Sequence, residues 1–217
     1  MKVLIACEES QTVCKAFRAL NHEAYSCDLQ ECSGGRPEWH IKDDAIKILY
    51  SDSWDLVVAH PPCKRLANSG VRWLNERDLW EELKESISFF NAFRDYGRAG
   101  NKIALENSIP HKYAMAGIGD NYTQIIHPWQ FGHLEQKATC LWLYNLPKLK
   151  ETNNVKEEMK KLSKSERQRV HFCSPGKDRA KLRSKTYPGI AQAMAMQWGG
   201  PPFFFSRELS DAKTESV

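Results

Sequence analysis

A short apolar run that two prolines interrupt is the feature that most constrains the fold of this chain. Residues 56–59 (LVVA) have the length and composition of a buried strand, and Pro61 and Pro62 follow almost at once. Proline has no N–H to donate to a sheet, so the strand has to end there. Cys63 comes next. The sequence therefore predicts a thiol on a proline-stiffened turn at the end of a core strand.

A second apolar run, residues 103–105, ends in Glu106 and Asn107. Functional groups of α/β proteins gather at the carboxyl ends of the strands. We therefore expect the thiol and this carboxylate to lie at the same edge of a sheet. Such a pair suits covalent chemistry on an electrophilic ring that also needs a proton.

Strand-like and helix-like segments alternate along the chain, and residues 109–121 between them are expected to form a loop. The expected strands cover residues 2–6, 23–27, 56–59, 103–105, 122–129 and 139–143, and the expected helices cover residues 13–20, 79–96 and 190–198. This alternation predicts an α/β fold with a Rossmann-like, mostly parallel sheet and helices on both faces.

Cysteine usage and hydropathy exclude several classes of protein. The seven cysteines contain no CxxC pair, which argues against a zinc knuckle or a disulfide scaffold. No apolar run approaches the roughly 20 residues of a membrane span, and the opening MKVLIACEES does not resemble a secretory signal. We expect a protein of the reducing cytoplasm, with no metal and no membrane partner, for which a monomer is plausible.

Positive charge is concentrated between residues 148 and 185, although the net charge is only +4. In the first half of this segment glutamates interleave the lysines, so a solvated face explains it as well as a phosphate-binding surface does. In residues 177–185 a single aspartate opposes five basic residues, which favours nucleic acid.

These motifs, in this order, resemble those of the DNA cytosine-5 methyltransferases. Pro62-Cys63 matches the family's nucleophile turn, and Glu106-Asn107 matches its later Glu-Asn motif. The segment VLIACEES, with the helix and strand that lead to Asp28, occupies the place of the S-adenosylmethionine loop. Phe131-Gly132 with Gln136-Lys137 resembles the segment near the flipped base, and TYPGIAQAMAMQWG at 186–199 resembles the segment that completes the cofactor pocket.

The resemblance is colinear over most of residues 1–147 and 186–199, with three departures. Cys7-Glu8-Glu9 stands where the family's cofactor loop carries glycines. Lys137 stands where an arginine is expected, and the family's large target-recognition domain has no counterpart. Residues 1–147 with 186–207 would form the catalytic domain, residues 148–185 a reduced recognition segment and residues 208–217 a polar tail.

The resemblance implies S-adenosylmethionine as cofactor, DNA as partner and a prokaryotic cell or phage-infected host as the setting. The implied catalytic residues are Cys63, Glu106 and Asn107. The cofactor would be bound by Ala6, Cys7, Glu8, Ser10, Asp28, Asp44 and Pro61. The DNA or the flipped base would be bound by Lys64, Arg65, Asn68, Ser69, Arg72, Gln136, Lys137, Arg179, Lys181 and Arg183.

The implied chemistry assigns one role to each catalytic residue. The thiolate of Cys63 attacks carbon 6 of cytosine, which makes carbon 5 nucleophilic. Glu106 holds a proton on ring nitrogen 3, a role for which a dry environment would raise its pKa, and Asn107 orients the loop or the base. The histidines show no ligand spacing and are interpreted as structural or surface residues: His60, His111, His127, His133 and His171.

Two further functions stay open. A catalytically weak relative could bind DNA or cofactor as a decoy or regulator, which the altered cofactor loop and Lys137 favour. An enzyme acting on free deoxycytidine nucleotide would explain the missing recognition domain. The intact Cys63 and Glu106 argue against the first, and the basic run argues against the second. Asp28 is assigned to the cofactor ribose in preference to a turn cap, whereas for Asp44 the two roles are evenly balanced.

Overall fold

The computed structural model describes residues 1–174, 176 and 179–200, and for residues 180–182 it describes the backbone alone. The expected polar tail at 208–217 and the last part of the expected catalytic domain, residues 201–207, lie outside the described residues. So does the side chain of Lys181.

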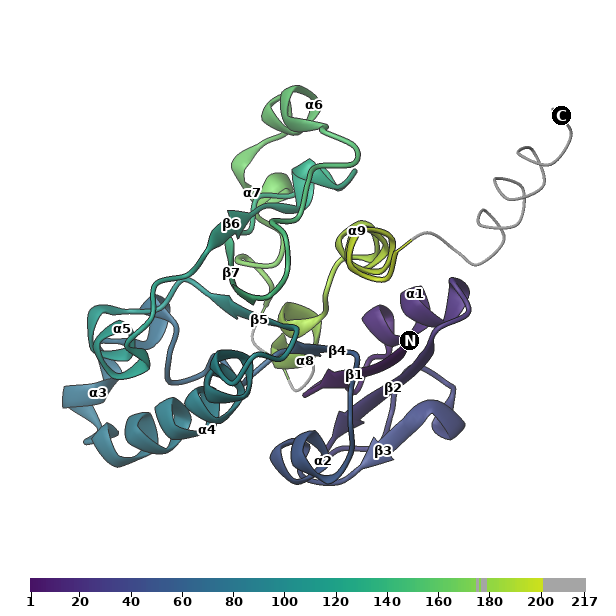
Figure 1. Cartoon of the computed structure of the whole chain (residues 1–217). Helices are drawn as coiled ribbons and strands as arrows, with labels where there is room; N and C mark the ends of the chain where they lie inside the picture. Colours follow the sequence, from purple (N-terminus) through teal and green to yellow (C-terminus); the bar gives the residue numbers. More distant parts are fainter. Residues whose placement is uncertain (175, 177–178, 201–217) are drawn as a thin grey trace, which may run out of the picture.

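Seven strands form one sheet in the order β3-β2-β1-β4-β5-β7-β6 (Figure 1). The neighbouring pairs from β3 to β5 are parallel, whereas β7 runs antiparallel to both β5 and β6. This arrangement confirms the predicted α/β, mostly parallel sheet. The strands are β1 Lys2–Ala6, β2 Glu23–Asp28, β3 His40–Lys42, β4 Leu56–Ala59, β5 Ile103–Ser108, β6 Gln124–Ile126 and β7 Thr139–Tyr144.

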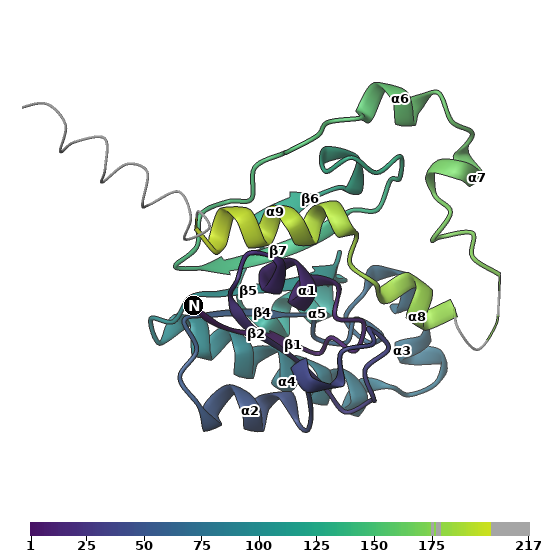
Figure 2. The same ribbon diagram turned by 90° about the vertical axis from the view of Figure 1, so that its right-hand side faces the viewer.

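Helices cover both faces of the sheet, as the alternation predicted. In Figure 2, α1 and α9 lie on one side of the sheet, and α2 and α4 lie on the other. Helix α5 packs against α4. These helices are α1 Thr12–Ala19, α2 Ala45–Ser51, α4 Trp80–Arg98, α5 Lys112–Ile118 and α9 Pro188–Trp198.

Strand β1 shows why the central strands are apolar throughout. Side chains alternate between the two faces of a strand. Leu4 therefore joins the core under α2 and α4, while Val3 and Ile5 join the core under α1 and α9. All three are fully buried. A strand with a core on each side reads as a continuous apolar run, and this is what made it visible in the sequence.

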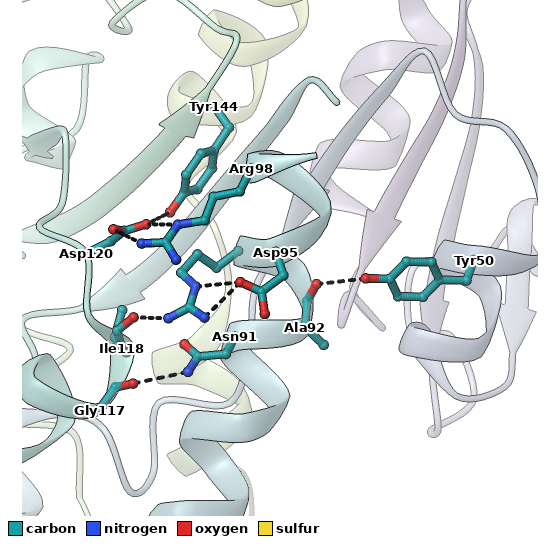
Figure 3. A network of polar contacts seen from close by, with 10 residues as sticks. Tyr50, Asn91, Ala92, Asp95, Arg98, Gly117, Ile118, Asp120 and Tyr144 are labelled. Atoms are coloured by element: carbon teal, nitrogen blue, oxygen red, sulfur yellow. Dashed lines mark hydrogen bonds and ion pairs between the residues drawn. The ribbon is translucent and has the colours of Figure 1, made fainter. Parts of the chain in front are cut away.

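A network of polar contacts fastens α4 to its neighbours (Figure 3). The Arg98 guanidinium pairs with Asp120, which also accepts a 2.7 Å hydrogen bond from the Tyr144 hydroxyl of β7. Asn91 donates to the carbonyl of Gly117 at 3.1 Å, which joins α4 to α5. Because α4 leads directly into β5, these contacts hold the strand that ends in Glu106.

Two expectations for the region after β5 are wrong. Residues 109–121 do not form a loop throughout, since they contain α5, whose first turn is capped by the His111 ring: Nδ1 accepts the Ala114 N–H at 3.0 Å. Histidine is not among the usual N-cap residues, so the sequence did not signal this start. The strand expected at 122–129 is reduced to β6, because Pro128 begins the short 3₁₀ helix Pro128–Gln130.

The described residues of the basic segment 148–185 include three short helices, α6 Lys156–Lys160, α7 Lys164–Arg167 and α8 Arg179–Ser184. The sequence predicts partly helical structure over residues 153–163, and α6 lies inside this range. Figure 1 shows α6 and α7 beyond the β6 edge of the sheet, whereas α8 lies nearer β4 and β5. The segment therefore leaves the sheet and returns to it.

Candidate active site

The register of the sheet brings His60 and Glu106 together. In the parallel pair formed by β4 and β5, Ala59 lies opposite Leu105, and His60 and Glu106 are the next residue of each. Nδ1 of His60 donates a 2.7 Å hydrogen bond to Oε2 of Glu106. The two side chains are only 13% and 15% exposed. A largely buried imidazole–carboxylate pair thus lies at the carboxyl ends of the two strands that the sequence singled out.

Asn107 joins the end of β5 to the start of the loop that carries Cys63. Its Nδ2 donates to the carbonyl of Pro61 at 2.7 Å, and Asn107 is 3% exposed. Cys63 lies two residues after Pro61 in this loop. The loop after β4 and the end of β5 are therefore fixed to each other by two contacts, one from His60 and one from Asn107.

A tight turn presents Cys63 to solvent. Its carbonyl accepts the N–H groups of Leu66 and Ala67, at 3.1 and 2.9 Å, and both of these side chains are buried. Nε2 of His111 donates to the carbonyl of Arg65 at 2.8 Å, which anchors the far side of the turn. Cys63 itself is exposed, and it is the one exposed cysteine of the seven.

The remaining cysteines lie in less accessible positions. A lone cysteine is usually a buried small hydrophobic residue, which predicts burial of Cys14, Cys27, Cys140 and Cys173. Cys14, Cys27 and Cys140 are buried, and burial raises the pKa of each thiol, to about 11 for Cys27. Cys173 is only partly buried, so the prediction is wrong for this residue. A high pKa suppresses the reactive thiolate, so the three buried thiols are unsuited to nucleophilic chemistry.

The charge of the pair differs from the expectation for Glu106. Burial by itself raises the pKa of this carboxyl, as predicted, but the hydrogen bond and charge of His60, together with Lys137 and the Thr186 hydroxyl, outweigh burial and lower it. For His60, burial lowers the pKa, and the contact with Glu106 and the charge of Glu8 outweigh it and raise the pKa. These opposite shifts favour an imidazolium–carboxylate ion pair, and the prediction of a raised Glu106 pKa is wrong.

Glu8 is a second buried carboxyl, at the end of β1, and it caps α1. Its two oxygens accept the N–H groups of Val13 and Cys14 at 2.7 and 3.2 Å. It is 5% exposed, and burial raises its pKa despite the opposing charge of His60 and these hydrogen bonds. The amides at the start of α1, which a cofactor could otherwise use, are therefore occupied by the chain's own side chain.

The reversal of β7 explains how Lys137 reaches the site. Because β7 is antiparallel to β5, its first residue, Thr139, lies opposite Ser108 at the carboxyl end of β5. Lys137, two residues earlier, is close enough to lower the pKa of Glu106 by its charge. Its Nζ donates to the carbonyl of Arg183 at 3.0 Å. A residue before a strand thus joins a site otherwise built from residues after strands.

The basic segment is fastened beside this centre. Glu135, 6% exposed, accepts hydrogen bonds from Arg169 and from the Tyr187 hydroxyl. The backbone N–H of Gln136 donates to the carbonyl of Arg167 at 2.6 Å. These contacts bring the segment back so that Thr186 reaches Glu106. Of the basic residues expected to bind DNA, Arg179 donates from Nε to the carbonyl of Cys173 at 2.8 Å.

The residues expected to bind DNA after Cys63 differ in what they contact. Arg65 is engaged with Glu82 of α4 at 2.6 Å, so it fastens the loop. Lys64, Asn68 and Ser69 are exposed. Arg72 is also exposed and lies over the Trp73 ring at 4.2 Å, and Arg77 lies over the same ring at 4.1 Å.

The residues expected to bind the cofactor lie at or just after the ends of β1, β2, β3 and β4. Ala6 accepts the N–H of His60 at 3.0 Å, and Pro61 is buried beside it. Cys7 has a left-handed backbone (φ 59°), and burial and the charges of Asp28 and Asp44 raise its pKa. Ser10 contacts Glu8. Asp44 caps α2 by accepting the Ile46 N–H at 2.7 Å.

Sequence reasoning missed four residues of this region. His60 was interpreted as a structural or surface residue, although its position beside the two prolines was a usable signal. Glu135 and Thr186 gave no signal, because their roles depend on the return of the basic segment to the sheet. Arg77 was also missed, although its spacing from Trp73 within one helical turn could have indicated it.

Two hollows on the described surface lie away from the centre. One of about 750 Å³ is lined by residues of α1 and by Arg36 and Trp39. The other, about 320 Å³, lies between α1 and α9. Neither of these two hollows is lined by Cys63, His60 or Glu106.

No protein-family model and no curated protein matches this chain. None of the described helices has the length and apolar character needed to cross a bilayer. Within residues 1–174, 176 and 179–200 there is no group of three His, Cys, Asp or Glu side chains that could hold a metal ion.

Proposed function

We propose that this protein is a DNA cytosine-5 methyltransferase. The observation that carries the proposal is the pairing of two strand ends: an exposed thiol on a fixed turn after β4, tied through Asn107 and His60 to the end of β5, where Glu106 lies. The sheet, parallel except at β7, fits the methyltransferase fold that the resemblance implies.

The residues support a covalent mechanism in two stages. In the first, the thiolate of Cys63 forms a bond to carbon 6 of cytosine, and the electron pair of the ring double bond moves to carbon 5 while ring nitrogen 3 accepts a hydrogen bond or proton through Glu106. In the second, the carbon-5 proton leaves after methylation, the bond to Cys63 breaks, and the double bond re-forms.

S-adenosylmethionine, when bound, supplies an electrophilic methyl group. Asp28 at the end of β2 fits the ribose hydroxyls, since its Oδ1 accepts the Gln30 N–H at 2.9 Å and Oδ2 has no partner among the described residues. Ala6, Cys7 and Pro61 would flank the cofactor. Glu8 does not fit a direct contact, because both its oxygens face α1. Asp44, as the cap of α2, is better explained structurally.

DNA is the proposed substrate. The target cytosine would have to be flipped out of the duplex, because this chemistry cannot reach a stacked and paired base. Support comes from the exposed residues on the Cys63 side and from the basic segment anchored at Glu135. Arg72 and Arg77, held over Trp73, are suited to contact backbone phosphates.

The decisive experiment is nucleoside mass spectrometry of unmodified DNA incubated with the protein and S-adenosylmethionine. We expect 5-methylcytosine with the wild type and with Cys32→Ser, a matched control in a partly buried thiol, but none with Cys63→Ser. Absence of a methylated base with the wild type on DNA of varied sequence would refute the proposal. Activity that survives Cys63→Ser would refute the nucleophile.

One observation favours a second function, that of a DNA-binding homologue with weak or no catalysis. Glu8 accepts hydrogen bonds from the Val13 and Cys14 N–H groups at the start of α1, so these amides are not available to the cofactor. Calorimetric titration with S-adenosylmethionine separates the two: a catalyst binds it, whereas DNA binding without measurable cofactor binding would favour the homologue. Free deoxycytidine nucleotide in the same mass-spectrometric assay tests the remaining alternative.

A further inference from the structure

His60 lies between two buried carboxyl groups. Its Nδ1 contacts Glu106 at 2.7 Å, and its charge interacts with Glu8 on the other strand end. Its Nε2 is buried and has no hydrogen-bond partner among the described residues. The described contacts of this imidazole therefore run through Nδ1 to Glu106, which is the group that the proposed reaction uses.

The proposed reaction places a demand on Glu106 that an isolated carboxylate does not meet. Ring nitrogen 3 of neutral cytosine has a lone pair and no hydrogen, so it needs a donor. An ionised carboxylate only accepts hydrogen bonds. An imidazolium–carboxylate pair, by contrast, contains one mobile proton, and that proton already lies in the hydrogen bond between the two groups.

We propose that His60 is a positioning residue that stores this proton and delivers it to Glu106 when cytosine enters the site. The inference rests on the proposed function and deepens it. The Nδ1–H bond breaks as an O–H bond forms on Glu106, leaving a neutral imidazole and a neutral carboxylic acid. The acid donates to ring nitrogen 3. When the bond to Cys63 breaks, the proton returns by the same route, so the pair is unchanged over one cycle.

Four groups from neighbouring elements lie close to the pair. Glu8 at the end of β1 favours the imidazolium, and Lys137 before β7 opposes it. Cys140 on β7 lies close enough for Glu106 to raise its pKa, and the Thr186 hydroxyl donates to Glu106 from the segment before α9. Because the side chains of the pair are less than one-sixth exposed, the proton that Glu106 receives at neutral pH comes from His60 and not from bulk water.

The test uses His60→Asn, in which Asn Nδ2 can keep the hydrogen bond to Glu106 but carries no transferable proton. We expect kcat at neutral pH to fall by about 10- to 100-fold, with little change in KM for DNA, and to recover as the pH is lowered and solvent protonates Glu106. His22→Asn is the control, a buried histidine at the amino end of β2. An unchanged pH profile in His60→Asn would assign His60 a structural role alone and overturn the inference.

A second measurement does not depend on methylation. Nuclear magnetic resonance titration of ¹⁵N-histidine-labelled protein should show His60 protonated to higher pH than free histidine in the same buffer, and Glu106→Gln should remove the difference. A His60 that titrates like free histidine in the wild type overturns the inference even if the enzyme is active. A wild type that is inactive on DNA yet shows the shifted titration overturns the proposed function and leaves the ion pair established.

Discussion

The loop after β1 and the loop after β4 begin at adjacent strand ends but use their functional groups differently. In the loop after β1, Glu8 turns inward and caps α1. In the loop after β4, two prolines and a tight turn leave Cys63 exposed, with its carbonyl satisfied by Leu66 and Ala67. In the first loop, the carboxyl group of Glu8 is used to hold a helix. In the second loop, the backbone groups are hydrogen-bonded to each other and the thiol of Cys63 stays available.

The same contrast holds for the two buried carboxyl groups. Glu8 and Glu106 share His60 as a neighbour, yet burial raises the pKa of Glu8, while the direct contact with His60 overcomes burial and lowers the pKa of Glu106. A direct imidazole contact, more than depth, decides the direction in which the pKa of each carboxyl shifts.

The first prediction compares the methylation activity of variants at Glu106 and at Glu8. Glu106→Gln should lower kcat on DNA by about 10²- to 10⁴-fold, because the amide cannot relay a proton. Glu8→Gln should lower it by less than about tenfold, because it retains an oxygen that accepts from α1 and affects the pair only through the lost charge near His60. Steady-state methylation kinetics measure both. Equal losses in the two variants would contradict the distinction between a structural and a reactive carboxyl.

The second prediction concerns the pH dependence of stability. The raised pKa of His60 stabilises the fold at low pH, and this contribution disappears as the pH rises through that raised value. The lowered pKa of Glu106 stabilises the fold above its unfolded value of about 4.3 and fails at lower pH. His60→Asn should therefore cost most, about 1.5–3 kcal/mol, between about pH 4.5 and 6.5.

Urea unfolding of the wild type and His60→Asn across this range gives the difference directly. His22→Asn serves as the control, because the pKa of His22 is lowered, chiefly by burial. A lowered histidine pKa has the opposite sign, so the wild-type contribution of His22 should weaken as the pH falls. A His60 difference that does not vary with pH would argue against an ion pair.

The third prediction tests the tie between the strand ends. Asn107→Ala should lower the free energy of unfolding by about 1–3 kcal/mol, because it leaves the Pro61 carbonyl without its donor. Asn68→Ala, in the exposed 3₁₀ helix Asn68–Gly70, is the matched control and should change it by less than about 0.5 kcal/mol. Chemical denaturation followed by circular dichroism measures both. Equal effects would mean that the Asn107 contact does not hold the loop.

The fourth prediction concerns the contribution of the α1 cap to the free energy of unfolding. Glu8→Ala should cost about 0.5–2 kcal/mol, since it removes the acceptor for the Val13 and Cys14 N–H groups. The loss is limited because a buried carboxyl whose pKa is raised already destabilises the folded state once it ionises. Glu8→Gln, compared in the same thermal unfolding experiment, should cost less than Glu8→Ala. The reverse order would show that the capping oxygen contributes nothing.

The parts predicted correctly from the sequence depend on local pattern. Strands β1, β4 and β5 are buried on both faces, so each leaves an apolar run with a recognisable end. The strand ends located Cys63 and Glu106 for the same reason. Helix α5 was missed because it is short and is capped by His111, and β6 was overextended because Pro128 lies inside the apolar stretch.

The parts that the sequence did not reveal depend on distant segments. The charge of Glu106 follows from His60, 46 positions earlier in the chain, and from Lys137 and Thr186, which reach it only through the reversed β7 and the returning basic segment. Asp44 is an example of the opposite kind. An acidic residue just after a strand was a reasonable ligand candidate, yet its side-chain oxygen caps the first turn of α2. Position at a strand end identifies candidates, and three-dimensional partners decide their roles.

The accessibility of Cys63 also affects how the protein must be handled. The other six thiols are partly or wholly shielded, so air oxidation will act first at the residue on which the proposed chemistry depends. Two molecules stored without reductant would join through this sulfur into a disulfide-linked dimer, which migrates in a gel without reducing agent at about twice the mass of the monomer. Such a preparation would keep its fold and lose its nucleophile, and a reducing agent would restore it within a single incubation.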